Sequence, residues 1–431
     1  MSRISKVMKN SMFLLLLSTG SVFAGDGADE VAMQIADLQK RLQDLEANAM
    51  DPKDYIQTFR KEKNFTVSLS GHLNRGMLAL NNNKKSQLYH VDNDNSSSRL
   101  TLGGEGKVSD DVKLSTIIEF QLEDNSSSKM TLDQTKNDPN ANARQNPEAN
   151  NAITTRKMDM NFTHTKYGGI WMGKGDAASE GIAEANLDGT YVVTAASAIH
   201  ALAGNVKMNQ KDKTGATATG PSISAVFDNF DGAGRPNRIK YVSPNMNGVV
   251  LQAGHISGDT VDGSVGFDGA VGDTKISAIM GAAKFKNNGP GLGYTNLAGS
   301  AAVLFGNGIS GSVAVGKQKR AQKLRQDGSF FHTKLGYRQN FFDCGETKLA
   351  IDYGQFKHVG AVARTSADNI ELDDKQNGTG KTYAIMAVQS LNKAGTELYS
   401  IYRRYKLTGV KNKNIGYDSV SAFLAGARVK F

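Results

Sequence analysis

The chain has 431 residues, with 51 Lys and Arg against 42 Asp and Glu, and a formal net charge of +9. Its longest strongly apolar run, residues 12–17, is far shorter than the ~20 apolar residues of a membrane-spanning helix. This excludes a helical membrane protein but not a membrane β-barrel, whose strands alternate apolar and polar residues. The single cysteine, Cys344, excludes an intrachain disulfide. The basic residues are spread along the chain rather than gathered in a block, so we expect no nucleic-acid partner.

Residues 1–24 have the three-part pattern of a secretory signal peptide. Basic residues precede the apolar run 12–17, and the segment ends on the small residue Ala24. We therefore expect export of the chain and cleavage after Ala24. The alternative interpretation is a buried N-terminal helix.

Residues 28–50 have the apolar spacing of a coiled coil. Ile35 and Leu42 occupy a positions, and Leu38 and Leu45 occupy d positions. About three heptads are too few for a helix that is stable alone, so we expect it to associate with neighbouring copies of the chain. An amphipathic helix that lies on its own domain is the alternative.

After Asn64 the period of the apolar residues changes from about 3.5 to two, which is typical of strands with one apolar and one polar face. In the first such run, residues 65, 67 and 69 are apolar, and residues 66, 68 and 70 are Thr or Ser. The last run comprises Phe423, Ala425, Ala427, Val429 and Phe431.

Seven short connections lie between alternating segments, and each predicts a hairpin. They are at 109–110, 166–168, 244–248, 272–273, 306–308, 339–346 and 392–395. Long polar stretches separate these hairpins, at 81–97, 124–153, 176–237 and 357–380. With a first strand at Phe65 and a last strand that ends at Phe431, the seven hairpins predict 16 antiparallel strands.

An even number of antiparallel strands, with short turns at one end and long loops at the other, is the layout of an outer-membrane barrel. Sixteen strands leave an aqueous channel inside. A soluble β-sandwich or an extracellular repeat protein is the alternative, but neither explains the alternation of short and long connections.

Several segments resemble stretches of the trimeric general porins of Gram-negative outer membranes. They are Gly71-His72-Leu73-Asn74-Arg75, the loop 91–97, the segment 175–191 and the aromatic-ended strand 423–431. The resemblance implies a homotrimer in the outer membrane, inserted by the barrel-assembly machinery with Phe431 as the signal. The segment 28–50 departs from the simplest members and resembles the periplasmic stalk of some substrate-selective trimeric porins.

The predicted fold is therefore a 16-stranded antiparallel transmembrane β-barrel with a short N-terminal coiled-coil helix. The predicted domains are the signal peptide (1–24), a periplasmic coiled-coil segment (25–52), a linker (53–64) and the barrel (65–431). In the porin family the third external loop folds into the barrel, and the resemblance implies the same for 176–237. Its acidic residues Glu180, Glu184 and Asp188 are then expected at the constriction, whereas an external solvated loop is the alternative.

Strand parity predicts the remaining lumen-facing residues, because alternate residues of a strand point to opposite faces. Of the adjacent Arg403 and Arg404, we predict that Arg404 faces the lumen. Arg403 shares its parity with Tyr399 and Ile401, which we expect to face lipid. Arg75 breaks the parity of its strand, which indicates a bulge, a rim position or a subunit contact. The predicted pore-lining residues are basic Arg99, Lys113, Arg238, Lys240, Lys334, Arg338, Arg404 and Arg428, and acidic Glu119.

We predict a water-filled channel for passive diffusion of small hydrophilic solutes and ions. The alternatives are a substrate-selective channel, for example for anions, and a surface adhesin or structural barrel. We expect no enzymatic activity, cofactor or metal, because the seven His fall on separate elements and no Gly-x-Ser-x-Gly elbow joins a strand to a helix. A barrel-borne phospholipase, with Ser, His and Asn on one face, is the enzymatic alternative.

Overall fold

The computed structural model describes residues 56–62, 65–132, 153–194, 198–211, 220–286, 293–321, 327–359, 378–410 and 413–431. The predicted signal peptide (1–24) and coiled-coil segment (25–52) lie outside the described residues. The described residues belong to one compact unit that begins at Tyr55. No helix among them has the length and apolar character needed to cross a bilayer.

The described chain is mostly β-strand. The strands are β1 (Ile56–Glu62), β2 (Phe65–Asn81), β3 (Ser86–Asp92), β4 (Arg99–Lys107), β5 (Val112–Leu122), β6 (Ile153–His164), β7 (Gly168–Lys174), β8 (Asn237–Val242), β9 (Val249–Ile256), β10 (Thr260–Val271), β11 (Thr274–Phe285), β12 (Tyr294–Leu304), β13 (Ile309–Arg320), β14 (Gly328–Phe342), β15 (Gly345–Lys357), β16 (Thr379–Leu391), β17 (Thr396–Val410), β18 (Lys413–Gly416) and β19 (Val420–Lys430). The short helices are η1 (Asp94–Ser96), η2 (Ser127–Lys129), η3 (Ile199–Leu202), α4 (Ile223–Val226) and η6 (Asn392–Ala394).

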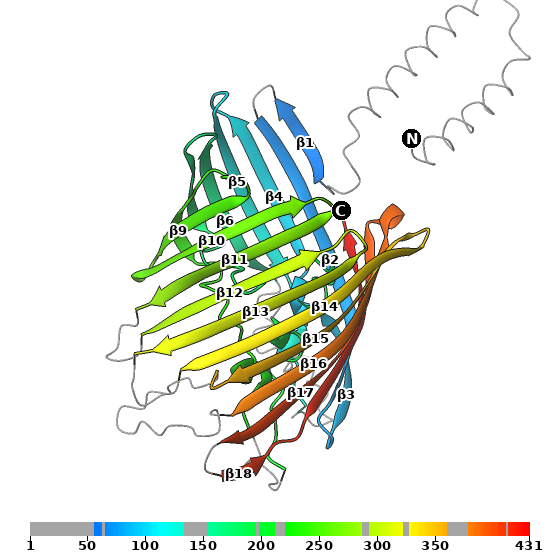
Figure 1. Cartoon of the computed structure of the whole chain (residues 1–431). Helices are drawn as coiled ribbons and strands as arrows, with labels where there is room; N and C mark the ends of the chain where they lie inside the picture. Colours follow the sequence, from blue (N-terminus) through cyan, green and yellow to red (C-terminus); the bar gives the residue numbers. More distant parts are fainter. Residues whose placement is uncertain are drawn as a thin grey trace, which may run out of the picture. The chain divides into compact units, whose positions relative to one another are not determined.

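The wall is a closed antiparallel barrel. From β4 to β17 each strand pairs with the next along the chain. β19 then pairs with β17 on one edge and with β2 on the other, which closes the ring (Figure 1). Among the described strands, β2, β4–β17 and β19 make the 16 strands of the wall, as predicted. Closure matters because a bilayer offers no water to an unpaired strand edge.

The seven predicted hairpins are confirmed, because the seven short connections join β4–β5, β6–β7, β8–β9, β10–β11, β12–β13, β14–β15 and β16–β17. Gly308 shows why one of these turns requires glycine. Its φ is +86°, and a Cβ there would lie 2.0 Å from the carbonyl oxygen of Arg338 on the next hairpin. At the opposite end the connection 257–259 between β9 and β10 is also short, so that end does not carry long loops throughout.

Two regions of the wall differ from the sequence-based expectation. The segment predicted as a linker (53–64) contains β1, which pairs with residues 65–70 of β2. The polar stretch 81–97 contains β3, which pairs with the second half of β2, while β4 pairs with its first half. β3 and β4 thus share one place in the wall, and residues 93–98 interrupt it.

The two faces of the wall are inverted relative to a soluble protein. On β14 the charged or titratable residues His332 and Lys334 are buried, whereas Leu335 is 59% exposed. On β15 Asp352 is buried, whereas Ile351 is 53% exposed. Apolar side chains outside and charged ones inside are the distribution that a bilayer around the barrel requires.

A charge placed on the outward face is therefore expected to cost most near the middle of the wall. Ile351→Arg changes the seventh residue of the 13-residue strand β15, and we expect a loss of about 2–4 kcal/mol in the free energy of unfolding. Ile309→Arg, at the first residue of β13 beside a turn, is the matched control and should cost about 0–1 kcal/mol. Urea unfolding from liposomes measures both. Equal losses would contradict the assignment of the outward face.

Candidate functional site

The described residues of the long connection between β7 and β8 (175–194, 198–211 and 220–236) lie against the inward face of the barrel, and we call them the inner segment. Four contacts trace its course across the wall. Ser179 donates its backbone N–H to Asp262 of β10 (2.7 Å), and Ala185 donates to Ser300 of β12 (2.9 Å). Further on, Asp188 pairs with Lys334 of β14, and the carbonyl oxygen of Ile199 accepts a hydrogen bond from Tyr405 of β17. The described inner segment thus crosses from β10 to β17.

Aspartate side chains hold the backbone turns of the inner segment. The two carboxylate oxygens of Asp231 accept the N–H groups of Gly181 (3.0 Å) and Ala183 (2.8 Å). Asp188 accepts both the backbone N–H and the hydroxyl of Thr190, each at 2.7 Å. Such local bonds give the chain an alternative to helix or strand, so that a long connection takes a defined course.

The far part of the inner segment forms an apolar core with the wall. Phe227, next to α4, packs edge-on against Phe356 of β15 and Tyr405 of β17, with ring centroids 5.4 Å and 5.1 Å away. Close approach requires Gly380 on β16, because a Cβ there would lie 2.6 Å from Val226. This core was not predicted, since strand parity was interpreted on the assumption that the lumen is polar throughout.

A buried charge cluster lies between the inner segment and the wall. The Nζ atom of Lys334 lies 3.0 Å from the carboxylate of Asp188, and both side chains are almost fully buried. Beside them Arg403 makes two bonds to Asp352, at 3.0 and 2.5 Å, and His332 lies 3.7 Å from the same carboxylate. The sequence-based sites Lys334 and Asp188 are thus brought together as one ion pair.

The choice between the adjacent arginines of β17 was wrong. Arg403 is buried with Asp352, whereas Arg404 shares the face of the exposed Leu398 and Tyr402. Arg404 pairs in the ladder with Ser421, the second residue of β19, and its guanidinium donates to the hydroxyl of Ser419. The error arose because the parity of Tyr399 and Ile401 was taken as lipid-facing, but both are buried inside the barrel.

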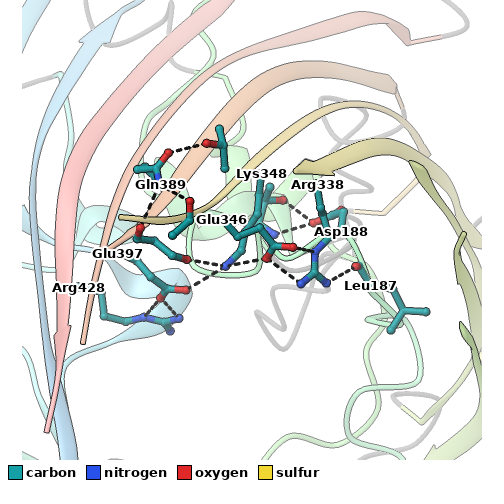
Figure 2. A network of polar contacts seen from close by, with 12 residues as sticks. Leu187, Asp188, Arg338, Glu346, Lys348, Gln389, Glu397 and Arg428 are labelled. Carbon is teal, nitrogen blue, oxygen red and sulfur yellow. Dashed lines mark hydrogen bonds and ion pairs between the residues drawn. The ribbon is translucent and has the colours of Figure 1, made fainter. Parts of the chain in front are cut away.

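A second set of ion pairs runs along the inward face from β14 to β19 (Figure 2). Arg338 pairs with Glu346 through two bonds of 2.9 and 2.8 Å and also donates to the carbonyl oxygen of Leu187. Glu397 lies 3.5 Å from Lys348 and accepts from Arg428, with Nε at 2.9 Å. We call this set of residues the basic belt. It consists of the basic residues Arg338, Lys348, Arg428 and Lys430 and the acids Glu346 and Glu397. Its basic residues therefore outnumber its acidic ones.

The wall from β5 to β8 carries further ion pairs. Arg238 makes two bonds to Asp159, at 2.8 and 2.5 Å. Glu119 pairs with Arg156 at 2.7 Å, and Lys157 pairs with Asp176 at 2.6 Å. A bulge in β6 places the neighbours Arg156 and Lys157 on the same face, because the register shifts there by one residue.

Besides Arg404, three predicted basic residues do not meet a buried carboxylate directly. The guanidinium of Arg99 donates to the carbonyl oxygen of Ser97 (3.1 Å). The Nζ atom of Lys240 lies 6.0 Å from the centre of the Trp171 ring. Lys113 pairs with Glu105 at 3.0 Å, but both side chains are about half exposed.

The inner segment carries a cluster of acids with altered proton affinity. Glu180 pairs with Arg235 at 2.7 Å, yet burial, with the charges of Asp231 and Asp176, raises its pKa to about 7. Burial and the charge of Glu184 likewise raise the pKa of Asp231 to about 7. Burial and the charge of Glu180 raise the pKa of Glu184, which accepts a hydrogen bond from Tyr191 at 3.0 Å.

The sequence-based set missed several of these residues. Asp159, Glu346, Lys348 and Asp352 follow strand parity, because they alternate with the outward-facing residues 158, 349 and 351. The missed residues without such a signal are Arg156 and Lys157 at the bulge, and Arg235 and Asp231 in the inner segment.

A closed barrel with an apolar exterior and a charged interior defines a channel-type protein of the outer membrane. A sequence profile of the Gram-negative porin family matches residues 46–409. The chain therefore belongs to the Gram-negative porin family and is an outer-membrane porin. A search of the curated proteins found no significant match.

Solved structures share the fold at low sequence identity. An anion-selective porin from Comamonas acidovorans is 17% identical, with a TM-score of 0.53 over 85% of this chain and 100% of the other. OmpF of Salmonella typhi is 12% identical, with a TM-score of 0.52 over 87% and 100%. The outer membrane channel DcaP of Acinetobacter baumannii is 11% identical, with a TM-score of 0.51 over 86% and 99%.

We expect the buried pair Lys334–Asp188 to contribute far more to the free energy of unfolding than a half-exposed ion pair does. In Lys334→Met the Asp188 carboxylate stays buried without its partner, which should lower the free energy of unfolding by about 3–5 kcal/mol. Lys113→Met is the matched control, and its half-exposed pair should contribute about 0–1 kcal/mol. Urea unfolding of both variants measures the difference. Similar small losses would show that the inner segment does not depend on this pair.

Proposed function

We propose that the chain forms a water-filled channel for passive diffusion of small hydrophilic solutes and ions across the outer membrane, without enzymatic activity. One observation carries the proposal: a closed barrel encloses a charged inward face, and the inner segment narrows the space between its walls. Diffusion needs no nucleophile or metal. It needs fixed charges and a constriction that set the size and the sign of the solute.

We assign the constriction to the gap between the inner segment and the wall from β4 to β8. The wall supplies Arg99, Arg156 and Lys240, and the inner segment supplies Glu180 and Glu184. Opposite charges on facing sides produce a transverse field, which favours dipolar and polar solutes over apolar ones. The predicted lumen-facing residues Lys113, Arg238, Lys334, Arg338, Arg428, Glu119 and Asp188 then act mainly through the ion pairs that shape this passage.

The direct test is a planar-bilayer recording of the purified protein with a liposome-swelling assay. We expect stable ion conductance and swelling rates that fall as neutral sugars increase in size. A structural barrel or an adhesin with a blocked lumen would give no conductance and no swelling. Such a result would contradict the diffusion proposal.

The acids of the inner segment make the ion preference depend on pH. Below a pKa of about 7, Glu180 and Asp231 hold protons and are neutral; above it they are negative. Raising the pH from about 5 to about 9 should therefore increase the permeability of cations relative to anions, measured as a reversal potential in a salt gradient. The free energy of unfolding should fall between about pH 5 and the folded-state pKa of about 7, because the folded state holds protons that the unfolded state has already lost, and should level off above it.

Matched variants separate the effect of these acids on the ion preference from the effect of other charges in the lumen. Glu180→Gln should reduce the pH step in the reversal potential, whereas Glu105→Gln, in the half-exposed pair with Lys113, should leave it unchanged. An unchanged pH step in Glu180→Gln would contradict the assignment of this acid to the constriction.

A substrate-selective channel for anions is the second candidate, and the basic belt favours it. Arg338, Lys348, Arg428 and Lys430 outnumber Glu346 and Glu397 there. One structural relative is an anion-selective porin, at an identity that shows the fold alone. A saturable current that one anionic solute blocks at micromolar levels would favour this candidate over general diffusion.

We also propose a homotrimer in the outer membrane, with residues 28–50 as a periplasmic coiled-coil stalk and Phe431 as the insertion signal for the barrel-assembly machinery. The heptad spacing supports the stalk, and the exposed aromatic residue at the end of the last strand supports the signal.

Deleting residues 28–50 tests the stalk, because the seam of this helix would join the copies. We expect the trimer to dissociate at a lower temperature in mild detergent, measured by native mass spectrometry. An unchanged dissociation temperature would refute the stalk without affecting the barrel.

A further inference from the structure

Six exposed lysines gather on the outward face of the strands β11 to β17, which lie side by side in Figure 1. All six lie at the end of the wall opposite the short turns. Each has the parity of exposed apolar residues on its own strand: Lys381 and Ile385, for example, are four residues apart on β16 and point to the same side. We call this set the lysine rim, which consists of Lys284 on β11, Lys317 and Lys319 on β13, Lys357 on β15, Lys381 on β16 and Lys406 on β17.

The other end of the same strands has no such charges. Beside the short turns, the outward residues of the described strands β11 to β17 are apolar or uncharged, and include Ile276, Val303, Ile309, Tyr337, Leu349 and Leu398. In outer-membrane barrels the short turns face the periplasm and the other end faces outward. The lysine rim therefore meets the outer leaflet of the membrane.

The lysine rim lies at the level of the lipid headgroups. Lys357 follows Ile351, the middle residue of β15, by six residues. Six residues span about 20 Å along a strand, or about 15 Å across the membrane at a tilt near 40°. Because the apolar band of such a barrel is about 25 Å tall, Lys357 lies just beyond the hydrocarbon, where a charge costs about 0–1 kcal/mol.

The pairing of the strands places a hydroxyl residue between two lysines at two points of the lysine rim. The two lysines of each point are on strands about 10 Å apart, since neighbouring strands are about 4.8 Å apart. Their long side chains can reach one anion from both sides, and the hydroxyl can donate a hydrogen bond to it from the middle. These two lysine–hydroxyl rows are Lys284–Thr295–Lys319 on β11 to β13 and Lys317–Ser329–Lys357 on β13 to β15.

Most charges of the lysine rim have no acid partner within the described chain. Lys381 of β16 is the direct ladder partner of Lys406 of β17, and like charges in that position destabilise a sheet. Among the described residues, only Asp327 forms an ion pair with the lysine rim, through Lys317 at 3.3 Å. An anion from outside the wall would relieve the repulsion.

Two apolar grooves lie on the same outward face, nearer the middle of the wall. One, of about 460 Å³, lies between β9 and β13, and its lining includes Met280, four residues from Lys284 on β11, and the small residue Gly299. The other, of about 600 Å³, lies between β14 and β19 and is lined in part by Ile351 and Ile385. Grooves of this kind accommodate hydrocarbon chains whose headgroups lie at the lysine rim.

We propose that the lysine rim and the two grooves form a binding surface for a phosphate-bearing lipid of the outer leaflet. A phosphate group occupies each lysine–hydroxyl row, and the acyl chains lie in the grooves. Charge complementarity identifies this occupant, because lipid phosphates lie at the level of the lysines and supply the negative charge that the described wall lacks. The inference does not rest on the proposed diffusion channel, since it concerns the outer face of the barrel alone.

Native mass spectrometry of the full-length protein in mild detergent tests the proposal. The probe is the bis-phosphorylated glycolipid lipid A, compared at equal concentration with its fully dephosphorylated form and with inorganic phosphate. We expect saturable binding of lipid A and no binding of the other two. Equal binding of the dephosphorylated lipid, binding of inorganic phosphate alone, or no binding of lipid A would overturn the proposal.

Charge-matched variants test the location of the site. Lys284→Gln with Lys319→Gln should weaken the affinity for lipid A about 25-fold, because each lysine beside an anionic headgroup contributes about fivefold. Lys113→Gln with Lys275→Gln removes the same charge from exposed lysines beside the short turns, and should leave the affinity unchanged. Lys284→Arg with Lys319→Arg keeps the charge and should keep the affinity. Equal losses in the two glutamine variants, or no loss in either, would contradict the assignment of the lysine rim.

Discussion

The rest of the structure depends on one constraint: every strand edge of the wall must be paired inside a bilayer. The pairing of β19 with both β17 and β2 satisfies this constraint, because it closes the ring. Closure then gives each strand an outward side in hydrocarbon and an inward side sheltered from it. The alternation of Leu335 and Lys334 along β14 follows from that division, and so does the concentration of ion pairs inside.

The interior is more than a water-filled space lined with charges. The inner segment brings its own apolar residues, such as Phe227 and Phe230, and packs them on Phe330 and Phe356. On this side the barrel has a core like that of a soluble domain. The charges gather around it, in the buried cluster of Lys334, in the basic belt, and on the wall from β4 to β8. We infer that the passage for solutes is much narrower than a bare barrel of 16 strands.

Much of the wall could be predicted from the sequence, because strand alternation has a fixed period and turn residues mark its ends. The position of an ion pair is harder, since Lys334 and Asp188 are 146 positions apart and each was named for a different reason. Arg403 was missed because the apolar core reverses the usual meaning of parity on β17. Arg156 and Lys157 depend on a bulge that no local pattern announces, and β3 depends on an interruption within one wall strand.

The central claim is that the inner segment lies fixed against the inward wall. A disulfide between Ala178 of the inner segment and Gly254 of β9 tests it most directly, because a Cβ at Gly254 would lie 3.3 Å from the Cβ of Ala178, close to the spacing that a disulfide requires. In a Cys344→Ser background, Ala178→Cys with Gly254→Cys should oxidise readily and leave the single-channel conductance within about a fifth of its reduced value. Failure to form the disulfide, or a large drop in conductance when it forms, would show that the segment normally lies elsewhere.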